Sequence, residues 1–178
     1  IISYANYNVQ KVEELIPEQS NCGKRKPVNF DPEKHKKSHF QPGSQMGLDL
    51  QSCYLVDLLQ ISSLVNSTFF QPSDLIYLDL KCNKLQQLNG LEQLSSLKIL
   101  YLHGNEIADV KKLLTVKQLH LDALTVHGNP LVQQQNYKFW ILLNFPQIKR
   151  LDFGGVTKRE RGEAEFMQKQ GLITLKVQ

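Results

Sequence analysis

The chain has 178 residues, of which 41% are hydrophobic and 21% charged, and its formal net charge is +4 at pH 7. This length and composition are typical of one domain with a single elongated core. No apolar run reaches the roughly 18 residues that a membrane helix needs, so we expect no membrane span. The three cysteines are an odd number without metal-type spacing, which favours a reducing compartment such as the cytoplasm over a disulfide framework.

Residues 1–44 are expected to form a largely extended, basic N-terminal arm. Residues 3–16 are loosely amphipathic and fit either a short helix or an extended segment. Hydrophobic periodicity is absent from residues 19–44, which contain three prolines. Between residues 24 and 37, six basic side chains stand against two acidic ones, a balance of +4 that equals the net charge of the whole chain. The basic residues are Lys24, Arg25, Lys26, Lys34, Lys36 and Lys37.

Two interpretations of this basic arm remain open. It is either a solvated linker, as many charge runs are, or a contact for an acidic surface such as that of tubulin. Nucleic acid is the weaker candidate for the polyanion, because only Phe30 and Phe40 are interleaved with the basic residues and no RNA-binding signature is present.

Residues 45–156 are organised by the pattern LxxLxLxxNxL, which begins at Leu75, Leu97 and Leu121. The spacings of 22 and 24 residues fall within the period of about 20–29 that is typical of leucine-rich repeats. A fourth copy precedes these three with Cys53 in place of the asparagine, and a half-repeat follows at residues 148–156. The sequence therefore predicts an α/β leucine-rich repeat solenoid, a short curved horseshoe with a parallel concave sheet and about four repeats.

Alternation along each short strand assigns its side chains to two faces. Leu78, Leu100 and Leu124 are predicted to point inward, and so are Leu151 and Phe153 of the half-repeat. The outward rows are Asp49, Asp79, Tyr101, Thr125 and Asp152; then Gln51, Lys81, His103, His127 and Gly154; then Tyr77, Ile99, Ala123 and Arg150.

The outward face is the candidate binding surface, because a solenoid usually offers its concave side to partners and because tyrosine and arginine are favoured interface anchors. An ordinary solvated face is the alternative. The candidate protein-binding residues are Tyr77, Asp79, Lys81, Ile99, Tyr101, His103, Thr125, His127 and Arg150.

Asn83, Asn105 and Asn129 each follow a strand, where a side-chain amide can bond backbone groups that the turn leaves unpaired. We interpret them as a structural ladder rather than a site. Cys53 occupies the same position in the first copy, where a buried and unreactive thiol is expected.

Helical segments are expected on the convex side and at the C-terminal end. Residues 56–70 have a helix-like apolar pattern. Residues 137–143 predict an apolar helix that ends before Pro146 and seals the core. Residues 157–178 are expected to form a cap helix and tail, with Thr157 and Glu160 as a capping box at its start.

We expect no enzyme and no cofactor, because no catalytic or nucleotide-binding motif is present. His103 and His127 hold the same position in adjacent repeats, roughly 5 Å apart across neighbouring strands. With His120 they could bind a metal ion, but a zinc site needs three or four ligands, so we expect none.

The ending PQIKRLDFGGVTKRERGEAEF resembles the terminal cap of short cytosolic leucine-rich repeat proteins. These include a phosphatase-1 regulator, a spliceosomal A-prime subunit and a dynein light chain. The phrases LYLHGNEI, LTVHGNP, YKFW and DFGGVTKRERGEAE are similar to those of a member found in motile cilia. The resemblance implies a non-enzymatic component of the ciliary or flagellar axoneme that docks radial-spoke, linker or dynein-associated proteins on microtubules. The alternative is a regulatory or ribonucleoprotein subunit of the phosphatase-1-regulator or spliceosomal A-prime type.

Overall fold

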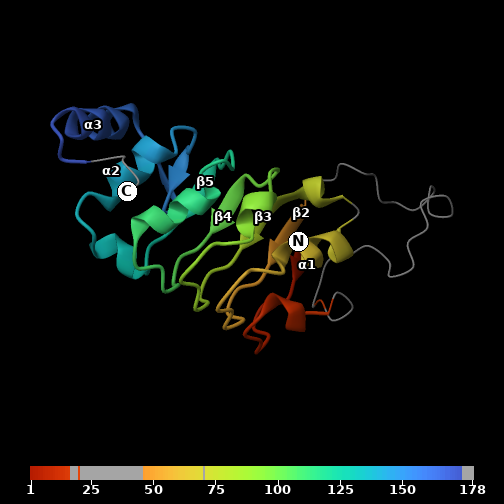
Figure 1. The fold of residues 1–178 in the computed structure, drawn as a ribbon. Helices are drawn as coiled ribbons and strands as arrows, with labels where there is room; N and C mark the ends of the chain where they lie inside the picture. The colour runs from red at the N-terminus through yellow and green to blue at the C-terminus, as the bar shows by residue number, and fades with distance from the viewer. Residues whose placement is uncertain (17–19, 21–45, 70, 174–178) are drawn as a thin grey trace.

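The computed structural model describes residues 1–16, 20, 46–69 and 71–173, which form a solenoid (Figure 1). Within these residues, seven strands form one sheet in chain order, parallel from β1 to β6 and antiparallel between β6 and β7. This confirms the predicted α/β leucine-rich repeat fold. The strands are β1 (Ile2–Ser3), β2 (Met46–Asp49), β3 (Leu75–Asp79), β4 (Ile99–Tyr101), β5 (Ala123–Thr125), β6 (Arg150–Leu151) and β7 (Gly154–Gly155).

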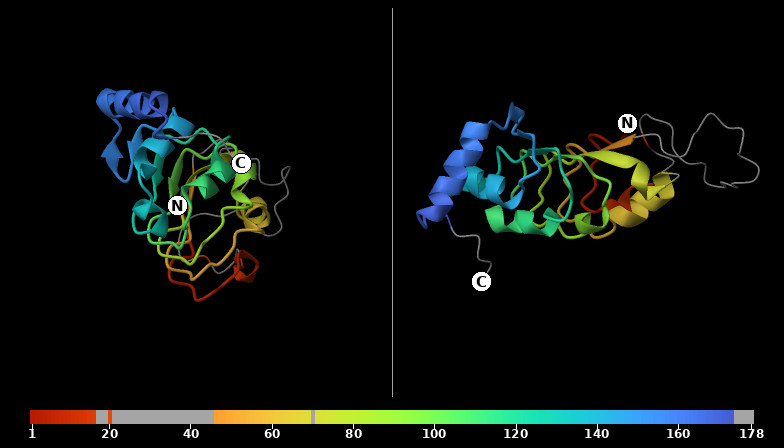
Figure 2. Two further views of the ribbon diagram at one scale, coloured as in Figure 1. Left: turned by 60° about the vertical axis from the view of Figure 1, so that its left-hand side comes forward. Right: turned by 90° about the horizontal axis from the view of Figure 1, so that it is seen from above.

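Short helical segments connect the strands and return the chain across the convex side, and the elements follow one another along the solenoid axis (Figure 2). None of the helices in the described part of the chain is long and apolar enough to cross a membrane. The 3-10 segments are η1 (Val12–Glu14), η3 (Pro72–Asp74), η4 (Leu91–Gln93), η5 (Val110–Val116) and η6 (Pro130–Gln133), and the α-helices are α1 (Ile61–Thr68), α2 (Tyr137–Asn144) and α3 (Lys158–Lys169).

The core is one continuous stack of leucines. Leu78, Leu100 and Leu124 lie in register on β3, β4 and β5, and all three are fully buried. Each repeat buries its leucines against the next one, since a single repeat has no other apolar surface to cover them. Full burial of one leucine contributes about 1.5–3 kcal/mol, so the repeats stabilise one another through this stack.

The N-terminal boundary differs from the prediction that residues 1–44 form an arm. Residues 1–16 close the N-terminal end of the solenoid: β1 pairs with β2, and Tyr4, Val12 and Leu15 are buried in the core. Backbone bonds continue the ladder beyond β1, from Tyr4 N–H to the Asp49 carbonyl at 2.8 Å and from Val9 N–H to the Cys53 carbonyl at 3.1 Å. The basic residues from 24 to 37 lie outside the described residues, so their role stays a prediction.

The three asparagines of the repeats are buried and bridge neighbouring turns. The Asn105 amide donates to the carbonyls of Leu80 at 2.9 Å and Leu102 at 2.8 Å, and its oxygen accepts the Leu85 N–H at 3.1 Å. Asn83 and Asn129 make equivalent bonds in their own repeats. Because an unpaired buried backbone group costs about 1–3 kcal/mol, each amide stabilises two adjacent repeats.

Close stacking of neighbouring repeats explains why each of the two HGN motifs contains a glycine. Gly104 and Gly128 both have φ of +70°, in the left-handed region. A Cβ on Gly128 would lie 3.2 Å from the Gly104 nitrogen, so a side chain there would press on the turn of the preceding repeat.

At the C-terminal end, α2 and α3 cap the core. Trp140 and Ile141 of α2 are buried, and α3 begins at the predicted capping box. The Thr157 hydroxyl accepts from the Glu160 N–H at 3.2 Å, and the Glu160 carboxylate accepts from the Thr157 N–H at 2.8 Å. Hydrogen bonds from Lys138 of α2 and from Thr157 lower the pKa of Glu160 to about 2. The cap helix is therefore tied to α2 by an ion pair at its own N-terminus.

Candidate protein-binding surface

The register of the strands places the outward residues in the predicted rows. Asp49, Asp79, Tyr101 and Thr125 are successive partners across β2 to β5. Tyr77, Ile99, Ala123 and Arg150 form the neighbouring row from β3 to β6. These rows line the concave side of the sheet.

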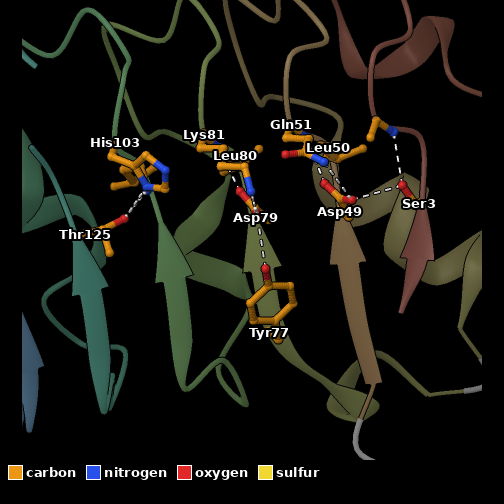
Figure 3. A network of polar contacts seen from close by, with 12 residues as sticks. Ser3, Asp49, Leu50, Gln51, Tyr77, Asp79, Leu80, Lys81, His103 and Thr125 are labelled. Carbon is orange, nitrogen blue, oxygen red and sulfur yellow. Dashed lines mark hydrogen bonds and ion pairs between the residues drawn. The ribbon is translucent and has the colours of Figure 1, made fainter. Parts of the chain in front are cut away.

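The end of this surface formed by β1, β2 and β3 is a polar network that is satisfied within the chain (Figure 3). Asp79 is only 2% exposed, and its carboxylate accepts from the Tyr77 hydroxyl at 2.9 Å and from the Lys81 ammonium at 3.1 Å. Asp49 accepts from the Ser3 hydroxyl at 3.0 Å. Burial, followed by the adjacent Asp79 carboxylate, raises the pKa of Tyr77, so this phenol stays neutral and continues to donate.

The opposite end of the surface is aromatic. Tyr101 packs edge-to-face against Tyr77 on one side and Phe153 on the other, with ring centroids 5.3 Å apart in both pairs. His103 and His127 stack face to face at 4.5 Å and 14°, and Phe153 lies 5.6 and 5.7 Å from the two imidazoles. We call these five residues the concave aromatic cluster. It brings β3, β4, the residues after β5 and the β6–β7 turn together on one exposed face.

Both histidines are oriented through their Nδ1 atoms. His127 donates from Nδ1 to the Asp152 carboxylate at 3.1 Å, and His103 Nδ1 lies 2.8 Å from the Thr125 hydroxyl. The hydroxyl can donate to a neutral imidazole there. Burial, and next the charge of His127, lowers the pKa of His103, so its neutral form is favoured near pH 7.

The stacked rings do not converge on a common point, and the described residues contain no group of three or more histidine, cysteine or acidic side chains suited to a metal ion. His120 lies outside the concave rows, and its carbonyl accepts from Lys98 at 3.4 Å. The two histidines pack on each other and against Phe153.

The prediction that Phe153 points into the core is wrong. The chain reverses after Leu151, and β7 pairs back on β6 through a two-residue turn in which Asp152 and Phe153 have φ of 49° and 66°. Gly154 therefore pairs with Leu151 and does not extend the row of His127. Phe153 is 60% exposed, and its ring packs against Tyr101 within the concave aromatic cluster.

Asp152 holds this turn against the last full repeat. Its carboxylate accepts from the backbone N–H groups of Val126 at 2.6 Å and His127 at 2.9 Å. These donors follow β5, where another parallel strand would otherwise accept from them. One side chain therefore completes the ladder and orients His127 in the same place.

A small hollow of about 40 Å³ lies within this surface, lined by Tyr101, Ala123, Thr125, Arg150 and Phe153 together with Leu124. It exists because the third row has its smallest side chain, Ala123, between Ile99 and Arg150. The hollow therefore borders both an aromatic pair and a cationic side chain.

The predicted binding residues differ in their access to a partner. Asp79 and Thr125 are buried and position their neighbours, whereas Tyr77, Lys81, Ile99, Tyr101 and His103 are half-buried and His127 and Arg150 are exposed. Phe153 is the surface residue that the sequence interpretation missed. The run Asp152-Phe153-Gly154-Gly155 is a usable signal, since aspartate and glycine mark tight turns.

Comparison with known proteins agrees with this architecture. The NXF1/2/3/5 leucine-rich repeat domain family matches residues 45–153. Leucine-rich repeat-containing protein 51 of Mus musculus is 33% identical, and that of Rattus norvegicus 34% identical, over 99% of this chain and 88% of each relative. The Drosophila melanogaster SNF/U2A′ complex contains a chain that superposes with a TM-score of 0.64 at 21% identity, over 96% of this chain and 83% of that one, and it supports the fold alone. The chain belongs to the leucine-rich repeat family that includes leucine-rich repeat-containing protein 51.

Proposed function

We propose that this protein is a non-enzymatic scaffold of the ciliary or flagellar axoneme, which binds neighbouring proteins on its concave surface. The concave aromatic cluster is the observation that supports binding most strongly. The exposed ring of Phe153 and the half-buried rings of Tyr77 and Tyr101 are held rigid by edge-to-face packing, so they supply contact area at a low cost in side-chain entropy.

The axonemal part of the proposal rests on the sequence resemblance to a ciliary member of the family. Its expected partners are radial-spoke, linker or dynein-associated proteins. The basic residues from Lys24 to Lys37 are proposed to reach an acidic surface such as that of tubulin, an attraction that salt would screen beyond about 8–10 Å. The protein would then have two contacts, one on the concave surface and one through the arm.

Cross-linking mass spectrometry on isolated cilia tests this proposal. Lys81 reports on the concave surface, Lys149 on the adjacent β6 edge, and Lys24 and Lys34 on the basic arm. We expect links from Lys81 or Lys149 to a spoke, linker or dynein-associated protein, and links from the arm lysines to tubulin.

Absence of the protein from the axonemal fraction would contradict the ciliary proposal. If it instead co-purified with a phosphatase catalytic subunit or a small nuclear RNA, the alternative of a regulatory or ribonucleoprotein subunit would take its place. Tyr101→Ala should reduce partner capture in either setting, because the concave surface is the proposed contact in both.

A further inference from the structure

The charges on the concave surface are paired unequally. The Lys81 ammonium lies 3.1 Å from Asp79, the His127 imidazole 3.1 Å from Asp152, and the Lys149 ammonium 2.9 Å from Asp122. Each of these carboxylates therefore already has a cationic partner or backbone donors.

Arg150 differs from its neighbours. It is exposed, and no hydrogen bond or ion pair to its side chain occurs among the described residues. Its position on β6, in the row of Ala123, places it at the border of the hollow beside Tyr101 and Phe153. A guanidinium at the border of a hollow that is lined by both polar and apolar side chains, with no acid of its own, is a charge that a bound partner can complement.

The size of the hollow limits what enters it. Its volume of about 40 Å³ is roughly three times the 10–15 Å³ that one water molecule requires. A carboxylate has three heavy atoms, so a group of this size fits the hollow. The bordering rings of Tyr101 and Phe153 would contact the apolar atoms that carry or flank such a group.

The backbone at Phe153 is a separate indication that this position serves binding. A bulky residue in the left-handed region is uncommon and energetically costly, because its Cβ crowds the following carbonyl oxygen. Glycine would occupy the second position of the turn without that cost. The chain instead carries a phenylalanine whose ring borders the hollow, and backbone strain of this kind clusters at ligand contacts.

We propose that the concave surface recognises an acidic segment of its protein partner, in which an aspartate or glutamate carboxylate is bound by Arg150 and the adjacent apolar residue lies against Tyr101 and Phe153. This inference rests on the proposed function, since it names the chemistry of the segment that the same surface binds. The fork of the guanidinium donates two parallel N–H groups to the carboxylate, a geometry that lysine cannot reproduce.

Selection from a random peptide display library on the full chain tests the inference, with Arg150→Gln and Arg150→Lys as variants. Arg159→Gln is the matched control, because it removes a guanidinium from α3 that is exposed and lies outside the concave rows. Tryptophan fluorescence verifies that each variant is folded. We expect enriched peptides to pair aspartate or glutamate with an apolar neighbour, and to bind Arg150→Gln about tenfold more weakly or worse. The affinity of Arg150→Lys should lie between those of the unchanged chain and Arg150→Gln, and Arg159→Gln should bind the peptides as tightly as the unchanged chain does.

Three results would overturn the inference: enrichment of basic or uncharged peptides, equal binding of acidic peptides to Arg150→Gln, or no enrichment at all. Tyr101→Ala separates these failures from failure of the proposed function. If partner capture from cilia depends on Tyr101 but not on Arg150, the concave surface still binds protein and only the acidic segment is wrong.

Discussion

Phe153 allows the most specific prediction, because its left-handed backbone favours glycine whereas its ring contact with Tyr101 favours phenylalanine. Replacing it with glycine removes a left-handed penalty of about 1–2 kcal/mol. The same change loses the edge-to-face contact with Tyr101, worth about 0.5–1.5 kcal/mol, and adds about 0.5–1 kcal/mol of unfolded-state entropy. These contributions nearly cancel. We therefore expect the free energy of unfolding to change by no more than about 1.5 kcal/mol, whereas truncating a phenylalanine in a core would cost about 3–5 kcal/mol.

The difference in stability between Phe153→Ala and Phe153→Gly is a more stringent test than the stability of either variant alone. Phe153→Ala loses the ring but keeps a Cβ at positive φ, so it should be less stable than Phe153→Gly by about 1 kcal/mol. Phe166 on α3 is the matched control, since the two side chains are 60% and 61% exposed. In a regular helix the order is reversed, and Phe166→Gly should be less stable than Phe166→Ala by about 0.8–1 kcal/mol.

Urea denaturation followed by the fluorescence of the single tryptophan, Trp140, measures all four variants. Because Trp140 is buried beside α3, its emission should change on unfolding. Partner binding is measured on the same proteins, and both Phe153 variants should lose it. A loss of stability of about 3 kcal/mol or more in Phe153→Gly, or the same glycine–alanine order at both positions, would refute the reasoning.

Four further substitutions are predicted from the described contacts. Leu100→Ala should destabilise the chain by roughly 2–5 kcal/mol in urea denaturation, because Leu100 is fully buried. Tyr101→Ala should instead weaken partner binding by about 1 kcal/mol or more and leave the fold intact. Equal losses of stability in the two variants would mean that the inward and outward faces are misassigned. Burial holds the pKa of His103 below its usual 6.5, so the unfolded chain binds the proton first as the pH falls. The stability of the native state should therefore fall as pH drops below about 6.5. His103→Gln should reduce this pH dependence, and an unchanged pH profile in that variant would contradict the argument from burial. Glu160→Gln keeps the capping-box acceptor but loses the ion pair with Lys138, so it should cost about 0.5–1 kcal/mol at neutral pH. Because the native pKa of Glu160 is about 2 against the usual 4.5, the difference in stability between Glu160→Gln and the unchanged chain should shrink as pH falls from 4.5 toward 2. A difference that persists at the lowest pH would argue against the Lys138–Glu160 ion pair.

The repeats could be predicted from sequence because their pattern is local and periodic. The leucines of β3, β4 and β5 recur at nearly constant spacing, and that spacing fixes both the register and the outward rows. The capping box at Thr157 and Glu160 is equally local, since its partners are three positions apart in the sequence.

The two ends of the solenoid were harder to predict, for a physical reason. Residues Ile2 and Ser3 form too short a strand to show a period of two, and their position depends on bonds to β2 that are distant in sequence. At the other end, strand alternation predicts an inward Phe153, but the chain reverses at Asp152 and Phe153. One residue of reversal moves every later side chain to a different place, as happened with Gly154.

The exposed charges show what the sequence leaves open. Lys81, Lys149 and Arg150 look alike as basic residues near strands, but the first two have acidic partners in the fold. Pairing depends on where Asp79 and Asp122 lie in neighbouring elements, and only the structure separates Arg150 from the others.

The measurement that tests the central claim most directly is site-specific photo-cross-linking in intact axonemes. A photo-reactive phenylalanine analogue is placed at position 101, in the concave aromatic cluster, or at position 166, on the exposed face of α3. We predict that position 101 cross-links to one axonemal protein, and that position 166 does not cross-link to the same protein. Cross-links from position 166 with none from position 101 would contradict the account, because the partner would then bind the cap helix and not the concave surface.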